Sequence, residues 1–352
     1  MKRIFDIKAV SEAAADKARQ RVKNLVKPIG SLGLLEDYAV KLSGIFGKIG
    51  FAPMKKAVAV FAADNGVWDE GYTPVPQSVT AMQAVNMTKG ITGVGAICAC
   101  TGADVFVYDM GIRGFKGAKG IEDRRVGNGT NNIAQSPAMD ITQAMQAISH
   151  GIDAAEALAD KGYRLLGCGE MGICNTTTAA AVLCALTGAD PEDVVGRGAG
   201  LTDEQLAMKR AVVQRALTIN QTDSENALGV LSAVGGFDIA AMTGFYLGCA
   251  YRQLPAVIDG FISAVAALAA SRLSPLVTQY LFASHHSAEP GFSVVMEALC
   301  MEAPLKLNLR LGEGSGCPLM MNILDASAAM LQNMATFEEA KIDSSKLVDI
   351  SK

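Results

Sequence analysis

The stretch that organises the chain runs from Leu307 to Pro318 and reads Leu-Asn-Leu-Arg-Leu-Gly-Glu-Gly-Ser-Gly-Cys-Pro. Its leading leucines alternate with polar residues, a period of two that predicts a β-strand over 307–311. Glycines follow, with Glu313 between the first two, and an apolar segment of helical character begins at Leu319. Strand, glycine-rich turn and helix in this order build sites at the carboxyl ends of strands in α/β folds. Because glycine lets a ligand approach the backbone closely, we interpret Glu313 as the chemical centre of the protein.

Short apolar runs alternate with helical segments through the rest of the chain. Further strands are predicted at 56–63, 104–108, 163–166, 256–258 and 277–282. Helices are predicted at 79–88, 141–161, from 175 to before Gly188, at 202–219, 238–250, up to Arg272 and at 290–300. This alternation predicts an α/β fold, with a parallel sheet covered by helices on both faces. The long polar and glycine-rich connection 111–137 is expected to be a functional loop.

Two helices are predicted ahead of the first strand, within 8–27 and over 34–46, separated by a turn. They have no neighbouring strand, so we expect them to pack with the closing helix. This predicts a small helical subdomain made of residues 1–50 with about 319–352, beside an α/β catalytic domain over 51–318.

Composition narrows the class of protein. Net charge is −4 over 352 residues and no basic block occurs, so nucleic-acid binding has no support. The 8 cysteines form no CxxC pair, and no His/Cys group has structural-zinc spacing, so we expect reduced thiols and no metal. The first ten residues lack the apolar core of a signal peptide. The most apolar run, 254–270, is interrupted by Asp259 and is short for a membrane span, so we expect a cytoplasmic protein.

One glycine pattern has three interpretations. Gly167, Gly169 and Gly172 match G-x-G-x-x-G between a predicted strand and a predicted helix, the pattern of dinucleotide sites. Against that interpretation, Glu170 inside the motif would repel a pyrophosphate. This disfavours the dinucleotide interpretation, and a tight strand-to-helix turn is the plain structural alternative. A phosphate site at the start of the next helix fits the residues better. The helix that opens at 175–178 would then offer free amides and about half a positive charge to a phosphate monoester, although ordinary N-capping explains the same residues.

Two glutamates follow predicted strands in the same way, Glu170 after Gly169 and Glu313 after Gly312. Paired carboxylates beside an apolar cleft suit general-base work, or the stabilisation of an oxocarbenium-like sugar. A carboxylate that caps a helix after its glycine turn is the structural alternative, and residue chemistry alone leaves both open.

Three other features carry weaker signals. A second glycine-rich loop at 196–200 indicates a turn, and Lys209 on the next helix has the pattern of a solvated surface lysine. His285 and His286 are adjacent, so their side chains point apart and favour a polar binding turn over a metal chelate. No GxSxG elbow or GxxxxGK[ST] loop occurs, so the usual signatures of hydrolases and nucleotide triphosphatases are absent.

Taken together, these segments resemble one family through most of the chain, the nicotinate-nucleotide–dimethylbenzimidazole phosphoribosyltransferases of cobamide lower-ligand assembly (cobalamin biosynthesis). The segments that carry the resemblance are Ala63–Gly71, Val79–Met87, Gly169–Thr177, Val234–Asp238, Ser287–Glu289 and Leu311–Gly316.

The resemblance implies a dimer with a Rossmann-like parallel sheet and a small helical domain. It implies a glycosyltransferase, a pentosyltransferase that moves phosphoribose from nicotinate mononucleotide to an aromatic base such as 5,6-dimethylbenzimidazole. The products would be an α-riboside 5′-phosphate and nicotinate, with inversion at the anomeric carbon. No cofactor and no metal are expected.

The resemblance also implies roles for particular residues. Glu313 matches the catalytic base that takes the proton of the acceptor, and Glu170 matches a second carboxylate. Acceptor-pocket positions are Val75, Gln83, Met171 and Leu311. The ribose-phosphate side is formed by Gly172, Asn175, Thr176, Ser287, Gly312 and Gly314. Lys209 is expected to contact the phosphate, as a residue of the same subunit or of the dimer partner.

The chain departs from the family at four positions. Asn65 stands where members commonly have His, and Val75 where they have a small polar residue. Met171 replaces a usual Leu, and Cys317 a usual Ala. A more apolar, methionine-lined pocket can change which aromatic base fits. Benzimidazoles are the expected acceptors. The alternatives are a relative specific for phenol or p-cresol, or one subunit of a heterodimeric version with little activity alone.

Overall fold

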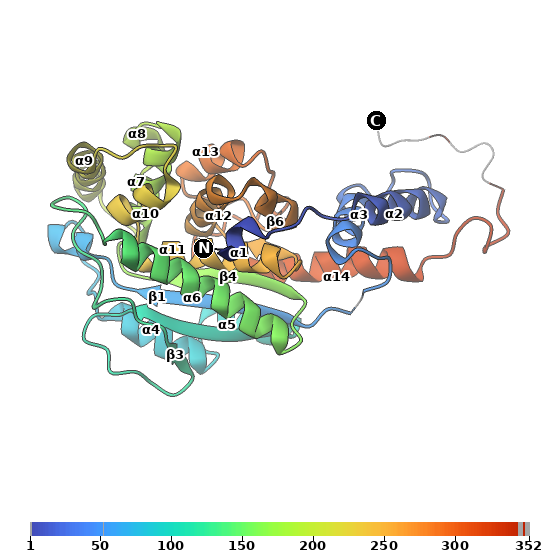
Figure 1. Ribbon diagram of the computed structural model, residues 1–352, viewed down its shortest axis with the longest axis horizontal. Helices are drawn as coiled ribbons and strands as arrows, with labels where there is room; N and C mark the ends of the chain where they lie inside the picture. The colour runs from blue at the N-terminus through green and yellow to red at the C-terminus, as the bar shows by residue number, and fades with distance from the viewer. Residues whose placement is uncertain (1, 52, 344–347, 349–352) are drawn as a thin grey trace.

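The computed structural model describes residues 2–51, 53–343 and 348 (Figure 1). Its strands form one parallel sheet in the order β3-β2-β1-β4-β5-β6. The strands are β1 (Lys56–Ala63), β2 (Ala103–Gly111), β3 (Ile121–Asp123), β4 (Leu165–Met171), β5 (Ala256–Ile258) and β6 (Leu281–Ala283). This is the strand order of the Rossmann fold, so the predicted fold class is confirmed.

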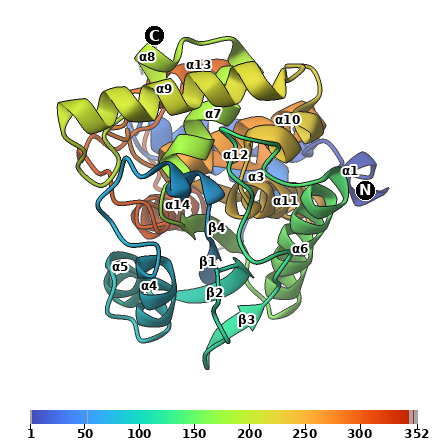
Figure 2. The same cartoon turned by 90° about the vertical axis from the view of Figure 1, so that its left-hand side faces the viewer.

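Strand β1 shows why the sequence specifies a covered sheet. All eight of its residues are buried, so it reads as a continuous apolar run and not as an alternation. One face of the sheet is covered by α6 (Ile141–Asp160), α11 (Phe237–Tyr251) and α12 (Phe261–Leu273). The other is covered by α4 (Val79–Thr88), α5 (Gly93–Thr101) and α14 (Cys317–Asn333), as Figure 2 shows.

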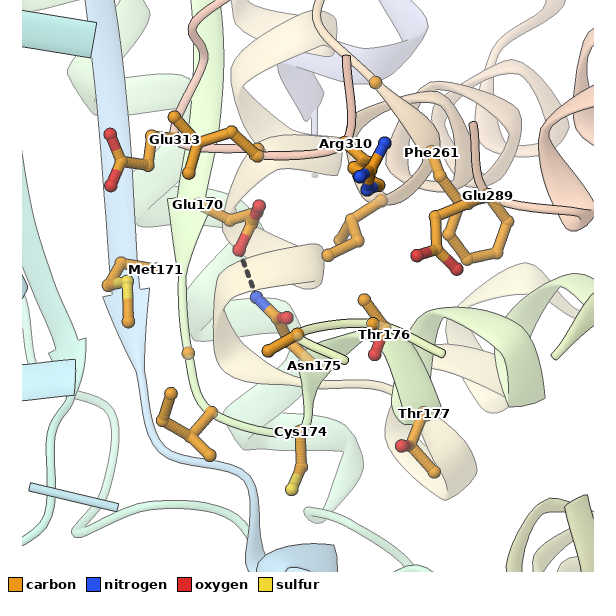
Figure 3. A pocket seen from close by; sticks show the side chains of 18 of the residues that line it. Glu170, Met171, Cys174, Asn175, Thr176, Thr177, Phe261, Glu289, Arg310 and Glu313 are labelled. Atoms are coloured by element: carbon orange, nitrogen blue, oxygen red, sulfur yellow. Dashed lines mark hydrogen bonds between the residues drawn. The ribbon is translucent and has the colours of Figure 1, made fainter. Parts of the chain in front are cut away.

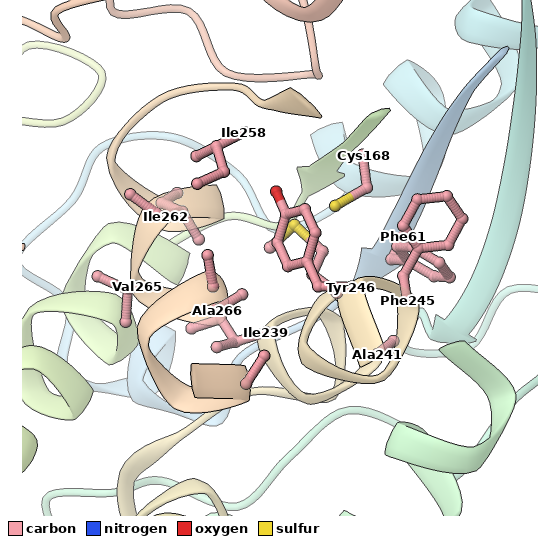
Figure 4. Close-up of a cluster of buried hydrophobic side chains, with 14 of the residues drawn as sticks. Phe61, Cys168, Ile239, Ala241, Phe245, Tyr246, Ile258, Ile262, Val265 and Ala266 are labelled. Atoms are coloured by element: carbon pink, nitrogen blue, oxygen red, sulfur yellow. The ribbon is translucent and has the colours of Figure 1, made fainter. Parts of the chain in front are cut away.

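Aromatic and aliphatic side chains fill the space between the sheet and α11 and α12 (Figure 4). The ring of Phe61 on β1 meets that of Phe245 on α11 edge to face, with centroids 5.7 Å apart. Tyr246 is fully buried and its hydroxyl pairs with that of Ser263 on α12. This packing fixes the positions of β4 and β5, whose carboxyl ends carry site residues.

The remaining helices of the α/β part gather beyond the carboxyl ends of the strands (Figure 1). They are α7 (Asn175–Thr187), α8 (Pro191–Val194), α9 (Asp203–Asn220), α10 (Ala227–Val234) and α13 (Gly291–Ala298). One short 3₁₀ segment, Gly66–Glu70, follows β1, and another, Pro275–Tyr280, leads into β6. Helix α9 is capped by Thr202, whose hydroxyl accepts the Gln205 N–H at 3.3 Å. The expected long loop 111–137 contains the short strand β3, which the sequence did not reveal.

Helices α2 (Glu12–Asn24) and α3 (Leu34–Phe46) pack on the distal part of α14, away from the sheet (Figure 1). A short α1 (Lys2–Phe5) precedes them. Six side chains form a separate buried cluster there: Ala18, Val22, Leu25, Ala39, Met330 and Leu331. The division into a subdomain of 1–50 with about 319–352 and a catalytic domain of 51–318 stays a prediction, and residues 344–347 and 349–352 lie outside the described residues.

The predicted strand over 307–311 is wrong. The segment forms no strand and joins no ladder, and the backbone at Asn308 is left-handed with φ of 54°. Leu307 and Leu311 are 50% and 58% exposed, so the alternation marks no buried face. Isolated contacts tie the segment to the chain after β6, such as Ala288 N–H to Leu309 O at 3.1 Å.

The predicted strand 277–282 is also mostly wrong, since Pro275–Tyr280 is a 3₁₀ helix and β6 covers only Leu281–Ala283. Helices α1, α5, α8 and α10 had no counterpart in the sequence-based prediction. Helix α5 matters most, because its first turn lies against Glu313.

Candidate active site

A cavity of about 340 Å³ opens at the carboxyl edge of the sheet (Figure 3). It lies beside the end of β4, next to central β1, where the strand order reverses direction and α/β folds hold their ligands. Of the thirteen residues assigned to the site from sequence, twelve line this cavity: Val75, Gln83, Glu170, Met171, Gly172, Asn175, Thr176, Lys209, Ser287, Leu311, Gly312 and Glu313. Gly314 lies outside the lining and acts through its backbone. The roles assigned to these residues stay predictions.

Glu313 lies in a turn of unusual backbone geometry. Its φ of 62° is left-handed, between Gly312 at 82° and Gly314 at 85°. The side chain is only 4% exposed and both carboxylate oxygens are engaged. Oε2 accepts the backbone N–H of Val94 at 3.2 Å, and Oε1 accepts the side-chain amide of Gln83 at 3.3 Å. Donors on α4 and α5 therefore hold this carboxylate at the cavity wall.

Asp259, which was not assigned to the site from sequence, holds the same turn through hydrogen bonds to its backbone. It follows β5 directly and is fully enclosed. Its Oδ2 accepts the N–H of Gly314 at 3.0 Å, and its Oδ1 that of Gly316 at 2.6 Å. Burial raises the pKa of Asp259 to about 7, against the lowering effect of these two hydrogen bonds. The sequence signal that could have assigned Asp259 to the site was the Asp259-Gly260 pair directly after the predicted strand 256–258.

Glu170 stands near the end of β4 and also faces the cavity. The side-chain amide of Asn175 donates to its Oε2 (Figure 3). The same amide also donates to Asp238 Oδ2 at 3.2 Å. Burial raises the pKa of Glu170 to about 8, and the nearby charge of Asp238 acts in the same direction. Its carboxyl packs against the Glu313 turn, because a Cβ at Gly312 would lie 2.4 Å from Glu170 Oε1. The two glutamates thus meet across one turn.

The far end of the cavity carries the positive groups. The Lys209 ammonium donates to Thr176 Oγ1 at 2.9 Å and to the carbonyl of Gly196 at 2.8 Å. Only 1% of Lys209 is exposed, so the interpretation as a solvated surface lysine is wrong. Burial lowers its pKa to about 8. Helix α7 begins beside it at Asn175, as predicted, so backbone amides and an ammonium converge where an anion would bind.

The predicted acceptor side is more apolar. Met171 and Leu311 face it, and Val75 is held by its carbonyl, which accepts the Trp68 indole N–H at 2.9 Å. Gln83 is already hydrogen-bonded to Glu313. This end can receive a flat aromatic molecule next to a carboxylate.

Several neighbours complete or support the site. His285 is buried and bonded to Ser284 at 3.0 Å, whereas His286 is exposed, so the two rings point apart as expected. Asn65 is fully buried behind the cavity and accepts a hydrogen bond from Thr178 at 3.4 Å. Cavity-lining residues not assigned from sequence include Tyr72, Cys174, Arg197, Phe261, Glu289 and Arg310.

The glycine motif has a packing explanation. A Cβ at Gly169 would lie 2.0 Å from the backbone nitrogen of Gly314, and one at Gly167 would lie 2.8 Å from the sulfur of Cys317. The space these glycines leave is occupied by the Glu313 turn and the start of α14. The structural-turn interpretation therefore accounts for the motif.

Two features are absent from the described residues, a group of metal-binding side chains and a membrane-spanning helix. In the described part of the chain, no three His, Cys, Asp or Glu side chains are grouped so that they could hold a metal ion. No helix there is long and apolar enough to span a membrane. All eight cysteines are free thiols.

Comparisons with known proteins agree with this geometry. A family model described as phosphoribosyltransferase matches residues 7–342. The nicotinate-nucleotide–dimethylbenzimidazole phosphoribosyltransferase of Clostridium perfringens strain 13 is 45% identical over 334 residues, which cover 95% of this chain and 92% of that protein. The chain belongs to the nicotinate-nucleotide–dimethylbenzimidazole phosphoribosyltransferase family. The enzyme of this name from Acetivibrio thermocellus is 47% identical, with 93% of each chain covered.

A solved structure supports the fold of this phosphoribosyltransferase family member. The crystal structure of the nicotinate-nucleotide–dimethylbenzimidazole phosphoribosyltransferase of Thermus thermophilus has a TM-score of 0.89 and 39% sequence identity. The match covers 95% of this chain and 99% of that one. The recognised family and the α/β fold class are thereby confirmed.

Proposed function

We propose that this protein is a pentosyltransferase that moves phosphoribose from nicotinate mononucleotide to 5,6-dimethylbenzimidazole or a related aromatic base. The observation that carries the proposal is one cavity with Glu170 and Glu313 at one end and buried Lys209 at the other. The names of the relatives support the same donor and acceptor. The reaction belongs to cobalamin biosynthesis.

The phosphate of the nucleotide would bind at the start of α7, against Lys209 and Thr176. In this proposal the ribose would lie across the cavity, with its anomeric carbon toward the Glu313 turn. One nitrogen of the acceptor attacks C1′ with its lone pair and forms the new N–C1′ bond. The bond from C1′ to nicotinate breaks, its electron pair leaves with nicotinate, and Glu313 takes the proton from the second acceptor nitrogen. Attack opposite the leaving group inverts the anomeric centre and gives the α-riboside.

Glu170 has a different part in this mechanism. With its pKa raised to about 8, its carboxyl is mostly protonated at neutral pH. It can donate a hydrogen bond to the ribose without adding a second full charge beside Glu313. Two carboxyl groups in unlike environments are a common arrangement when one acts as base and the other stays neutral. Most of the rate gain would come from holding the two substrates in line.

The acceptor is proposed to be a benzimidazole because the relatives carry that substrate in their names. Met171 and Val75 leave phenol and p-cresol as the alternative acceptors. A competition assay tests this: the purified chain is incubated with nicotinate mononucleotide and equal amounts of dimethylbenzimidazole, adenine, phenol and p-cresol. Benzimidazole riboside as the main product supports the proposal, and a phenolic riboside as the main product would replace it.

We propose a cytoplasmic homodimer that uses no cofactor and no nucleic acid. The heterodimeric alternative predicts little activity for this chain by itself. Nicotinate release by the chain expressed and purified alone distinguishes the two, with light scattering to give the mass of the active species.

A further inference from the structure

The carboxylate of Glu313 is held by donors from a single short stretch of chain, α4 and the start of α5. Val94 N–H reaches Oε2 at 3.2 Å and the Gln83 amide reaches Oε1 at 3.3 Å. Because each oxygen has its own donor, the plane of the carboxylate is fixed as well as its position. We call this pair of donors the carboxylate seat.

Asn86 sets the orientation of the first donor. Its side-chain amide donates to Gln83 Oε1 at 3.0 Å. The two residues are three apart on α4 and so lie on one face of the helix. Since Asn86 occupies the carbonyl end of the Gln83 side chain, the N–H₂ end is the one presented to Glu313.

Gly93 gives access to the second donor. It is the first residue of α5, whose Thr92 cap accepts the N–H of Gly95 at 3.4 Å and leaves that of Val94 for Glu313. A Cβ at Gly93 would lie 3.3 Å from Glu313 Oε2 and 2.4 Å from the end of Leu311. The backbone of Gly93 is helical, so space and not backbone conformation is what the glycine provides.

We propose that Asn86 and Gly93 are positioning residues for the transfer reaction, which orient Glu313 through the carboxylate seat. The proposal rests on the proposed function, in which Glu313 takes the acceptor proton. Neither residue touches the cavity, so both act through another side chain.

The first test is Gly93→Ala, with Gly44→Ala as its control. Gly44 lies in α3, and a Cβ there meets only ordinary contacts of 3.6 Å. Alanine favours helix over glycine, so neither variant should lower the melting temperature. The seat predicts that Gly93→Ala lowers kcat about tenfold, since small misplacements of reacting groups cost large factors in rate. KM for nicotinate mononucleotide and the kcat of Gly44→Ala should stay at wild-type values.

Leu311 needs a separate control because it can swing away from a new methyl group. In the double variant Gly93→Ala/Leu311→Ala the contact with residue 311 is relieved, but the contact with Glu313 remains. Because Leu311 itself lines the cavity, the reference is Leu311→Ala alone, and kcat of the double variant at saturating acceptor should stay below that of this reference. Equal kcat in the double variant and in Leu311→Ala would mean that Gly93 acts only on Leu311, and would overturn its assignment to the seat.

The second test is Asn86→Asp, which keeps the size but replaces the donor by an acceptor. Gln83 would turn its N–H₂ toward the new carboxylate and its oxygen toward Glu313, so kcat should fall about tenfold or more. In a Gln83→Leu background the same substitution should have no further effect, because residues that act through one another are not additive. An equal loss of kcat in both backgrounds would show that Asn86 does not act on Glu313 through Gln83.

The outcomes separate this inference from the proposed function. Wild-type kcat in both Gly93→Ala and Asn86→Asp overturns the seat while nicotinate release still supports the transferase. If the wild-type chain releases no nicotinate, the proposed function fails. The carboxylate seat is then tested by crystal structures of the variants. A Glu313 carboxylate that leaves Val94 N–H in Gly93→Ala but not in Gly44→Ala supports it, and an unmoved carboxylate overturns it.

Discussion

Asp259 Oδ2 lies 3.0 Å from the backbone nitrogen of Gly314, directly after the glutamate around which the site is built. The other oxygen of the same carboxylate accepts the N–H of Gly316 at 2.6 Å. A residue at the end of β5 thus fixes a turn with consecutive left-handed residues, which a free chain would rarely adopt.

Asp259→Asn should therefore damage both stability and activity. One oxygen becomes an N–H₂ group that faces a backbone N–H, so a buried hydrogen bond to a charged acceptor is lost. We expect unfolding free energy to fall by about 1–3 kcal/mol, and kcat by about ten- to a hundredfold because the turn shifts. Chemical denaturation and steady-state kinetics measure the two effects. Asp193→Asn, which changes the same charge at an exposed position, is the control; equal behaviour of the two variants would contradict the role of Asp259.

Glu313→Gln separates binding from proton transfer. The glutamine oxygen can still accept the Val94 N–H, so the turn and the melting temperature should be retained. A glutamine cannot take the acceptor proton, and we expect kcat to fall by about 10²–10⁴. Nicotinate release under saturating substrates is the measurement. Wild-type turnover in this variant would remove Glu313 from the base role.

Stability of the substrate-free protein should fall as pH rises. Burial raises the pKa of Glu170 from 4.5 to about 8, so between these values the folded state binds a proton that the unfolded chain has lost. The stabilising contribution is thus full below pH 4.5 and is lost as pH rises through about 8. Burial acts in the same direction on Asp259 and Asp238, whose pKa values rise to about 7 and about 6.

Glu170→Gln isolates this effect. The amide does not titrate and its oxygen can keep the bond from Asn175. The variant should gain on the order of a few kcal/mol relative to wild type at pH 8, and little at pH 5. Melting curves at several pH values provide the measurement. An unchanged pH slope in Glu170→Gln would show that this carboxyl is not the titrating group.

Lys209 should govern nucleotide affinity. Burial lowers its pKa to about 8, so in the free enzyme the ammonium is lost as pH rises through that value. KM for nicotinate mononucleotide should therefore rise above pH 8, while Lys209→Met should raise KM about tenfold or more at neutral pH and abolish this dependence. Lys119→Met, an exposed lysine on the β2–β3 connection, is the control. A pH-dependent KM that persists in Lys209→Met would contradict the assignment.

The sheet could be predicted because its central strands are continuous apolar runs with polar turns at their carboxyl ends. The strand over 307–311 could not, because alternation in an exposed segment looks the same as alternation on a half-buried strand. Helix α5 was missed since Gly93 and Gly95 lower helix propensity and its short apolar sequence lacks a polar face. Its existence is decided by packing against β2.

The meeting of Glu170 and Glu313 could be predicted from their similar places after glycines. The hydrogen bonds from Gly314 and Gly316 to Asp259, and the carboxylate seat, could not be predicted. Each depends on distances between segments far apart in sequence. Asp259 and Gly314 are separated by 55 positions, and Val94 and Glu313 by 219. Such pairs become visible only when the chain is folded.

The space beside Gly169 has a consequence for how such motifs are used in genome annotation. In dinucleotide enzymes the missing side chains admit a pyrophosphate; in this protein they admit the peptide bond that follows Glu313. A substitution at Gly169 would displace part of the protein itself before any ligand was affected. Its phenotype would look like misfolding even in a chain whose substrate contacts were all intact. A glycine pattern thus locates vacant volume along a backbone, and only the folded chain tells which molecule fills it.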